Sequence, residues 1–419
     1  MREMKDSGVA WIGEIPEEWD LLRFKDHYKN IKEVAGEKSF EYDRLALTLN
    51  GVIKRKKDDS DGLQPKEFDG YQILRKNDFI FKMIDLQNIS TSRVGLSQYT
   101  GLVSPAYIRF TPRKKDSFNK FVYYYLMSMY YNCVFNNLGG NGVRSALNAS
   151  DMGRLMIPYP KIETQHQIAT YLDQKCTQID ALITNQQKQI EKLKAYKQSL
   201  ITETVTKGLN PDVPMKDSGV EWIGEIPEDW KVIRVKNLLN ERKERSLTGE
   251  EEPLSMSQKV GLVPTKILDM IPNMASSFVG AKIVYINDLV FNKLKAHLGV
   301  FSISMYNGLV SPDYAVYYST GKANLKYLEY LFKTPQCICE FRKRSTGIAA
   351  GLTRLYTDGL FAIECPYPSF NEQQAIVSYL DQKCTQIDKL ISIKQKKIEK
   401  LQQYKKSLIY EYVTGKKEI

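Results

Sequence analysis

Residues 171–180 read YLDQKCTQID, and residues 379–388 repeat these ten letters without a change. The segment IEKL at 190–193 recurs at 398–401 with the same offset of 208 residues. Solenoid repeats have much shorter periods, roughly 20–50 residues. The sequence therefore predicts a duplicated set of domains.

A second pair of matching segments opens each copy. MKDSGV at 4–9 returns at 215–220, and WIGEIPE at 11–17 returns at 222–228. All four tryptophans of the chain belong to these segments or follow them closely: Trp11, Trp19, Trp222 and Trp230.

Between these anchors the copies differ, and residues 28–75 show little resemblance to 239–285. Short identical islands then return: Asn77-Asp78 with Asn287-Asp288, and GLVSP at 101–105 with 308–312. The same scaffold is therefore predicted to carry two different surfaces.

Each copy ends in a long stretch with helical periodicity. Residues 165–207 and 372–413 contain no proline, and leucine or isoleucine recurs at seven-residue steps, which is typical of a coiled coil. The predicted interface residues are Leu172, Ile179, Leu193, Leu200, Leu380, Ile387, Leu401 and Leu408. Gln186 and Lys394 interrupt the two series and are candidates for setting the register. The alternative is two separate helices, each packed on its own domain.

These patterns predict an α+β fold with two globular domains that alternate with two long helices. The predicted segments are 1–160 (globular), 161–210 (helix), 211–369 (globular) and 370–419 (helix). Short strands are expected at 78–83, 107–110, 288–291 and 314–317, and helices at 119–138 and 323–342. The aromatic residues Phe121, Tyr124 and Tyr125 are interpreted as core. Gly208, followed by two prolines at 211 and 214, should end the first long helix.

A helix of about 40 residues spans about 60 Å. If the two helices pair antiparallel, a pseudo-twofold axis relates the copies. DNA makes one turn per ~34 Å, so such a pair could hold two DNA-reading domains one to two turns apart.

Composition favours a globular protein with a polyanionic partner. The chain has a net charge of +11, with 42% hydrophobic and 26% charged residues, and both copies share the positive excess. No apolar run approaches the ~20 residues of a membrane span, and the N-terminus lacks a signal-peptide core, so no membrane association and a cytoplasmic location are expected. The six cysteines form no disulfide pattern; Cys176 and Cys384 should pack as small hydrophobic residues. Cys337 and Cys339 lack further ligands, so no metal site is expected.

The motifs of catalytic sites are missing from the sequence. It has no Asn/Asp-Pro-Pro-aromatic loop of an amino-methyltransferase, no Gly-Lys-Ser/Thr phosphate loop and no nuclease carboxylate–lysine cluster. His27, His166 and His297 are scattered and are interpreted as structural or exposed. No catalytic residue is predicted.

The order of motifs in each copy resembles the specificity (S) subunits of type I restriction–modification enzymes. The resemblance rests on the WIGEIP opening, on GLVSP, on Pro-Tyr-Pro at 158–160 and 366–368, and on YLDQKCTQID at the start of the long helix. It covers essentially the whole chain.

The resemblance implies that each globular domain is a target recognition domain that reads one half of a bipartite sequence in double-stranded DNA. It implies that the helices dock two methyltransferase (modification) subunits, which carry S-adenosylmethionine and methylate adenine. Two restriction subunits, which use ATP and Mg, can join to cut unmodified DNA. The chain itself would hold no cofactor. The segment TETV at 202–205 resembles the family's spacer-setting segment.

Candidate DNA contacts are lysine, arginine and asparagine residues in loops and at strand ends, because Lys and Arg bind phosphates while Arg and Asn also read bases. The candidates are Lys54, Arg55, Lys56, Lys57, Lys82, Asn141, Arg144, Lys293, Lys295, Arg342, Lys343, Arg344 and Arg354. A solvated turn before Asp58 and Asp59 is the alternative interpretation of residues 54–57.

Two other functions remain open from the residues alone. The chain could be a coiled-coil protein-interaction scaffold without sequence-specific DNA binding, or a self-sufficient nuclease or methyltransferase. Salt-dependent DNA affinity would distinguish the first, and assays with divalent metal or a methyl donor would distinguish the second.

Overall fold

The chain folds into two compact units that share its two long helices. The computed structural model describes residues 2–48, 51–57, 67–84, 86, 93–114, 119–138, 146–258, 260–268, 277–347 and 353–419. Unit 1 comprises Met1–Gln187 and Lys396–Ile419, and unit 2 comprises Lys188–Gln395. The four segment limits predicted from the sequence stay a prediction.

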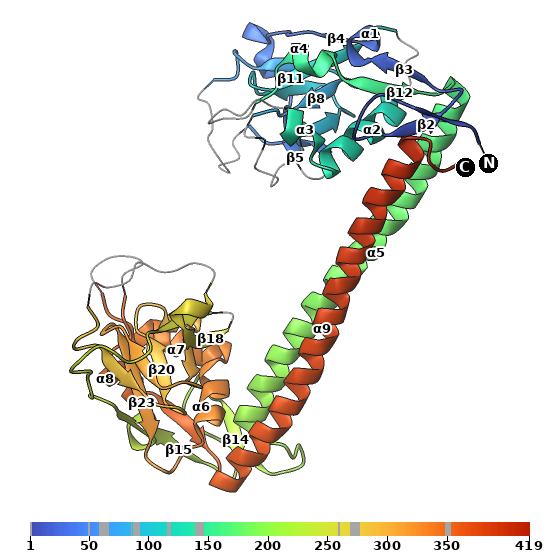
Figure 1. Ribbon diagram of the computed structural model, residues 1–419. Coiled ribbons are helices and arrows are strands. Elements are labelled where there is room, and N and C mark those ends of the chain that lie inside the picture. Colours follow the sequence, from blue (N-terminus) through green and yellow to red (C-terminus); the bar gives the residue numbers. More distant parts are fainter. Residues whose placement is uncertain are drawn as a thin grey trace. The chain divides into compact units, whose positions relative to one another are not determined.

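Unit 1 has short strands and short helices before its first long helix (Figure 1). Its strands are β1 (Met4–Asp6), β2 (Glu14–Pro16), β3 (Asp20–Arg23), β4 (Tyr28–Asn30), β5 (Arg44–Thr48), β6 (Gly51–Arg55), β7 (Gln72–Leu74), β8 (Phe79–Phe81), β9 (Val94–Leu96), β10 (Gly101–Val103), β11 (Ile108–Pro112) and β12 (Met156–Tyr159). Its helices are α1 (Phe24–His27), η1 (Gly36–Glu41), α2 (Asn119–Tyr131), α3 (Val134–Leu138), α4 (Ala149–Gly153) and the start of α5 (Ile162–Lys207).

Unit 2 repeats this order. Its strands are β13 (Met215–Asp217), β14 (Glu225–Pro227), β15 (Lys231–Arg234), β16 (Leu239–Glu241), β17 (Leu254–Ser257), β18 (Gly261–Pro264), β19 (Lys282–Val284), β20 (Leu289–Asn292), β21 (Phe301–Ile303), β22 (Gly308–Val310), β23 (Tyr314–Ser319) and β24 (Glu364–Tyr367). Its helices are η2 (Val235–Asn237), η3 (Thr265–Ile267), η4 (Ala296–Leu298), α6 (Leu325–Phe332), α7 (Pro335–Arg344), α8 (Thr357–Phe361) and the start of α9 (Phe370–Val413).

The sheets follow the duplication. Unit 1 contains the order β4-β11-β8-β9, and unit 2 contains the matching order β16-β23-β20-β21. A second sheet in unit 1, β6-β5-β10-β7, corresponds to the pairs β17-β18 and β19-β22 in unit 2. The four predicted strands are confirmed in type, since they overlap β8, β11, β20 and β23, although their limits differ by one or more residues.

Each unit has a large aromatic core against the long helices. In unit 1, Trp19, Phe24, Phe79, Phe121 and Tyr125 are each at most 1% exposed. The interpretation of Phe121, Tyr124 and Tyr125 as core is therefore confirmed. Unit 2 has the equivalent core, in which the Phe291 ring stacks on Phe301 at 4.5 Å between centroids.

The two helices predicted at 119–138 and 323–342 are each broken into two, so these predictions were wrong in extent. In unit 1 the Asn132 side chain donates to the Ser128 carbonyl, and Cys133 adopts a left-handed φ of 54°. Such side-chain bonds compete with the helix backbone. In unit 2, Thr334 caps the N-terminus of α7, and Pro335 occupies its first turn, which favours a new helix start there.

The long helices pair antiparallel within each unit (Figure 1). In unit 1 the Lys405 ammonium binds Asp180 at 2.7 Å, whereas the Tyr171 ring lies 4.7 Å from that of Tyr412. Going from the first contact to the second, the residue number falls along α5 and rises along α9, as antiparallel pairing requires. In unit 2, Lys197 binds Asp388 at 2.6 Å. By the 208-residue offset, these two residues are equivalent to Lys405 and Asp180 of the contact in unit 1. The predicted antiparallel pairing is therefore confirmed, and separate helices are excluded.

The predicted interface residues are buried or half-buried, and their role as contacts between the helices stays a prediction. Leu172, Ile179, Leu380, Ile387 and Leu408 are at most 6% exposed. The others, Leu193, Leu200 and Leu401, are half-buried. Gln186 is also buried, and Lys394 donates to the Gln189 carboxamide of the partner helix within unit 2. Lys394 therefore lies at the helix pair, as its predicted role in setting the register requires.

A tryptophan of each opening segment closes the end of one long helix. α5 ends at Lys207, before Gly208 with φ 80°, as predicted. A Cβ atom at Gly208 would lie 3.3 Å from the Trp230 ring in unit 2. The end of α9 repeats this arrangement in unit 1, with Gly415 (φ 70°) and Trp19. The repeated tryptophans therefore bind the helix that belongs to the other copy.

Cys176 and Cys384 are buried in α5 and α9, which confirms their interpretation as packing residues. Across the described residues, no helix has the length and apolar character needed to span a membrane.

Candidate DNA-recognition surfaces

The Asn-Asp islands make the same tight turn in both units. Asn77 and Asn287 adopt left-handed φ values of 70° and 69°, which asparagine tolerates better than most residues. The next residue is an aspartate whose carboxylate accepts the backbone N–H of the residue three positions earlier, at 2.8 Å in unit 1 and 2.9 Å in unit 2. The islands therefore fix the entry of the central strands β8 and β20.

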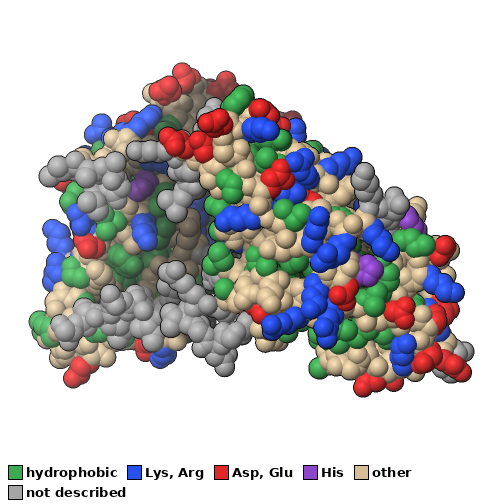
Figure 2. Space-filling view, turned by 90° about the horizontal axis from the view of Figure 1, so that it is seen from above, with side chains coloured by type: hydrophobic (Ala, Val, Ile, Leu, Met, Phe, Trp, Pro, Cys, Tyr) green, Lys and Arg blue, Asp and Glu red, His purple; other side chains and the backbone are tan. Residues whose placement is uncertain are grey.

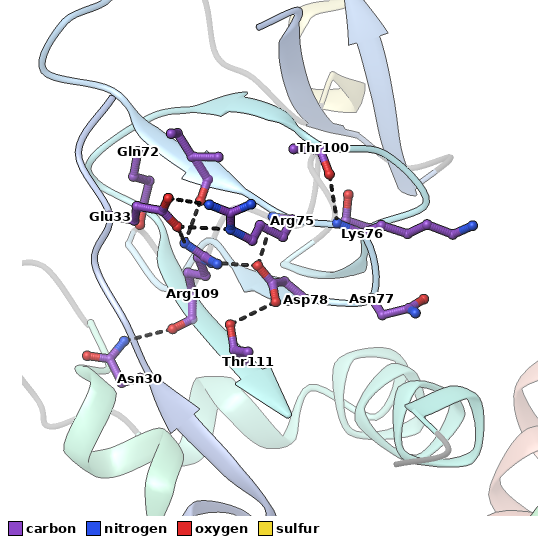
Figure 3. A network of polar contacts seen from close by, with 12 residues as sticks. Asn30, Glu33, Gln72, Arg75, Lys76, Asn77, Asp78, Thr100, Arg109 and Thr111 are labelled. Atoms are coloured by element: carbon purple, nitrogen blue, oxygen red, sulfur yellow. Dashed lines mark hydrogen bonds and ion pairs between the residues drawn. The ribbon is translucent and has the colours of Figure 1, made fainter. Parts of the chain in front are cut away.

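In unit 1 this aspartate lies at the buried end of an ion-pair network that reaches the surface at Glu33 and Arg75 (Figure 3). Arg109 of β11 is 2% exposed, and its Nε binds Asp78 at 2.5 Å. Its Nη1 donates to the Ile73 carbonyl at 2.5 Å and binds Glu33 at 3.1 Å. Arg75 also binds Glu33, and its hydrogen bond holds the pKa of this carboxyl below its usual value. The network ties β7, β8 and β11 together.

In unit 2 the matching aspartate binds an arginine from a different element. Arg242, next to β16, makes two hydrogen bonds of 2.8 Å to Asp288. Its guanidinium lies 4.6 Å and 4.8 Å from the ring centroids of Tyr285 and Tyr318. The same turn is therefore bound by arginines from different elements in the two units.

The GLVSP islands position a turn beside these strands. A Cβ at Gly101 or Gly308 would clash with the carbonyl oxygen of Asp43 or Glu252, so the glycine permits close approach of another chain segment. The residue after the Ser-Pro turn is Ala106 in unit 1 and Asp313 in unit 2.

The candidate residues 54–57 of unit 1 lie on and after β6, an edge strand. Lys54 binds Asp43 at 2.7 Å, and this hydrogen bond raises the pKa of Lys54. Lys57 donates to the Ser39 carbonyl at 2.8 Å. Arg55 lies opposite Arg44 on β5, a residue that the sequence analysis did not select. These residues form the basic edge, defined here as Arg44, Lys54, Arg55, Lys56 and Lys57.

The remaining candidates of unit 1 give less information. Lys82 directly follows β8, and its backbone N–H donates to Arg93. Asn141 and Arg144 lie outside the described residues.

In unit 2, the structure brings Lys293 and Arg354 together, because the Leu355 N–H donates to the Lys293 carbonyl at 3.0 Å. Arg354 binds Asp313 at 3.6 Å. Burial lowers the pKa of Lys293. Lys295 is exposed and precedes η4.

The candidates Arg342, Lys343 and Arg344 form the last turn of α7, where cations interact favourably with the helix dipole. Lys343 binds Glu340 at 2.7 Å, and Arg344 lies 3.6 Å from the same carboxylate. All thirteen candidates stay predictions as DNA contacts. Figure 2 shows Lys and Arg side chains in groups with acidic side chains between them.

One contact that occurs in both units was not predicted from the sequence. The Tyr124 hydroxyl donates to Asp173 at 2.7 Å in unit 1, and the Tyr330 hydroxyl donates to Asp381 at 2.6 Å in unit 2. The aspartates belong to the repeated YLDQKCTQID, so the repeat itself was the available signal. These bonds fasten α2 and α6 to the long helices.

Within the described ranges, no cluster of three or more His, Cys, Asp and Glu side chains could hold a metal ion. His27 stacks on Tyr159 with ring centroids 4.4 Å apart, and burial lowers its pKa. His166 lies in α5, where the sequence placed it.

Comparison with known proteins identifies a matching family model and similar proteins. Residues 24–192 match the family model of the type I restriction modification DNA specificity domain. A Methanocaldococcus jannaschii protein assigned as the MjaX specificity subunit of a type I restriction enzyme is 26% identical over 97% of this chain and 95% of its own. The MjaVIII specificity subunit of the same organism is 23% identical over 96% and 93%.

The fold is shared with a solved chain from a study of complex assembly and conformational transition in a type I R-M system. The TM-score is 0.69 at 13% identity, over 96% of this chain and 99% of that one. The duplicated units, the paired long helices and these matches agree with the resemblance found in the sequence. Residues 24–192 therefore belong to the family of the type I restriction modification DNA specificity domain, and over nearly its whole length the chain is similar to specificity subunits of type I restriction enzymes.

Proposed function

We propose that each unit reads one half of an asymmetric, bipartite site in double-stranded DNA. The observation that carries this proposal is the duplicated scaffold with unlike surroundings at equivalent places. The turn at Asp78 is bound by a buried arginine, whereas the turn at Asp288 is bound by a half-exposed arginine between two tyrosines. Two unlike surfaces on one scaffold suit two unlike half-sites.

The chain acts without chemistry of its own in this proposal. Catalysis belongs to partner subunits in the cytoplasm: two modification subunits with S-adenosylmethionine, and two restriction subunits with ATP and Mg. The family and the lack of catalytic motifs in the sequence support this division.

Exposed apolar side chains on the long helices support two partner sites. Leu182 and Leu390 are equivalent by the 208-residue offset and are 46% and 48% exposed. Tyr196 and Tyr404 are also equivalent and are 57% and 53% exposed. Each unit thus presents one such leucine and one such tyrosine. Duplicated apolar positions suit two copies of one protein partner.

DNA affinity should fall steeply with salt if the basic edge binds phosphates. The logarithm of the binding constant falls by about 0.9 per phosphate contact for each unit of log salt. We expect Lys54→Ala to weaken binding to every sequence alike and to reduce this slope by about 1. The measurement is a salt titration of duplex binding by the chain with its modification subunits.

Lys266→Ala is the matched control, because Lys266 is also exposed and paired with a carboxylate, at 2.9 Å. Salt-independent affinity would contradict DNA binding and favour the protein-interaction scaffold. The purified chain should neither cut nor methylate DNA when divalent metal or a methyl donor is added.

A further inference from the structure

Five ionisable side chains gather at one place in unit 2, and we call them the charged cluster: Glu241, Lys282, Lys293, Asp313 and Arg354. Lys282 binds Glu241 at 3.3 Å, and Arg354 binds Asp313 at 3.6 Å. The electrostatic influence of all four neighbours reaches Lys293. Lys293 also donates to the Pro312 carbonyl at 3.3 Å. The cluster contains three cations and two anions.

Strand register identifies two equivalent positions in unit 1. Lys282 and Gln72 each pair with the valine of GLVSP, and Glu241 and Asn30 each pair with an aromatic residue of the equivalent strands β23 and β11. The pairs are Lys282 with Val310, Gln72 with Val103, Glu241 with Tyr317 and Asn30 with Phe110. Asn30 and Gln72 appear in Figure 3, where both are uncharged.

Backbone contacts and motifs identify the other three positions. Lys293 and Met83 each accept the N–H of a leucine, at 3.0 Å and 3.1 Å. Arg354 and Ala146 are the residues directly before these leucines, and Asp313 and Ala106 directly follow the Ser-Pro turn. All five positions are therefore ionisable in unit 2 and uncharged in unit 1.

The scaffold does not require these charges, because unit 1 forms the same strands and turns without them. Placing charges at partly buried positions costs free energy unless they are paired. Met83 is 1% exposed at the position that Lys293 occupies in unit 2. Five neighbouring positions that all change from uncharged to ionisable point to a ligand that differs between the units.

We propose that the charged cluster is a base-reading site of unit 2, in which Arg354 and Lys293 bind guanine and Asp313 binds its paired cytosine. This inference rests on the proposed function. Arginine and lysine bind the O6 and N7 acceptors of guanine, and a carboxylate accepts from the N4 amino group of cytosine. The side chains of Arg354 and Asp313 are 36% and 56% exposed, so DNA can reach them while they hold each other. Two carboxylates beside the cations disfavour a phosphate ligand.

The test uses cells that lack the original gene and express a full-length variant together with the modification subunits. Methylome sequencing then determines which DNA motif is methylated in these cells. We expect Arg354→Ala to make one G·C position of one half-site degenerate, with about 5-fold to 150-fold loss of discrimination. The other half-site and the spacer should stay unchanged. Arg354→Lys should lose most of the same discrimination, because a flexible ammonium does not reproduce the fixed, parallel hydrogen bonds of the planar guanidinium at this position, whereas it would replace a phosphate contact. Lys266→Ala is again the control and should leave the motif unchanged.

A motif that keeps its G·C preference in Arg354→Ala would overturn the assignment, and so would rescue by Arg354→Lys. Retention of the other half-site shows that a variant is folded. If Arg354→Ala abolishes methylation altogether, Lys293→Met is tested instead, because methionine is the residue that unit 1 has at this position. Loss of the G·C preference at one position would then support the assignment, and retention of it would overturn the assignment. Failure of the proposed function is distinct, because the wild-type gene itself would then produce no gapped motif.

Discussion

Replacement of Arg109 by methionine is expected to lower the free energy of unfolding of unit 1 by about 3–5 kcal/mol. The change leaves Asp78 buried, at 1% exposure, without the cation that binds it at 2.5 Å. Thr111 and the Arg75 N–H still donate to the carboxylate, at 2.8 Å each, but neither carries a compensating charge there. An uncompensated buried charge is among the largest single-residue penalties in a protein.

Two matched variants separate burial from charge. Arg75→Met removes an exposed partner of Glu33 from the same network, and exposed pairs contribute only about 0–1 kcal/mol. Arg242→Met removes the equivalent cation of unit 2, whose side chain is 23% exposed, so water can partly solvate Asp288. For Arg242→Met we expect a loss of unfolding free energy larger than that of Arg75→Met and smaller than that of Arg109→Met.

Hydrogen exchange resolves the effect by unit. In Arg109→Met, protection should fall in β8 and β11 and persist in β20 and β23. Equal losses from Arg75→Met and Arg109→Met would show that the buried network does not hold unit 1 together.

Replacement of Leu172 by alanine is expected to lower the free energy of unfolding of unit 1 by about 2–5 kcal/mol. Leu172 is 0% exposed, and it belongs to a core cluster with Leu408, Ile409 and Tyr412 of α9. The shortened side chain leaves a cavity between the two long helices that rigid neighbours cannot fill. Urea unfolding monitored by tryptophan fluorescence measures the loss.

Leu182→Ala provides the same chemical change on the exposed side of α5. It should change the free energy of unfolding by less than about 0.5 kcal/mol, while it weakens binding of the modification subunits. If Leu182→Ala destabilised the chain as much as Leu172→Ala, the assignment of the helix seam would be wrong.

The duplication and the paired helices could be predicted because they depend on periodicity over many residues. Leu172, Leu380 and their seven-residue partners give an apolar stripe on each helix, interrupted once by Gln186 or Lys394. Local interruptions were harder to predict, and the break at Cys133 coincides with side-chain bonds from Asn132 to Ser128 and a left-handed φ at Cys133. The break before Pro335 had a visible signal, since proline favours the first turn of a helix.

The repeated islands were visible in the sequence, but their physical roles needed the contacts. Asn77 is repeated because its backbone is left-handed, and Trp19 is repeated because it packs on the end of a helix about 400 residues away. Neither role follows from local sequence. Arg109 gave no signal at all, because its partners are separated from it by 31 and 76 residues.

The candidate site was only partly predictable from charge. Lys293 and Arg354 were selected as separate cations, and the structure joins them with Asp313, which charge counting ignores. Lys343 and Arg344 were selected by the same criterion, yet both bind Glu340 on their own helix. Positive charge in a loop therefore identifies candidates, and only the neighbours distinguish a ligand site from a helix end.

Methylome sequencing of cells with and without the gene tests most directly whether the two units read two halves of one DNA site. The account predicts one asymmetric motif, interrupted by a spacer of fixed length, whose methylation disappears on deletion and returns with the gene. Loss of a continuous or palindromic motif, or an unchanged methylome, would contradict it.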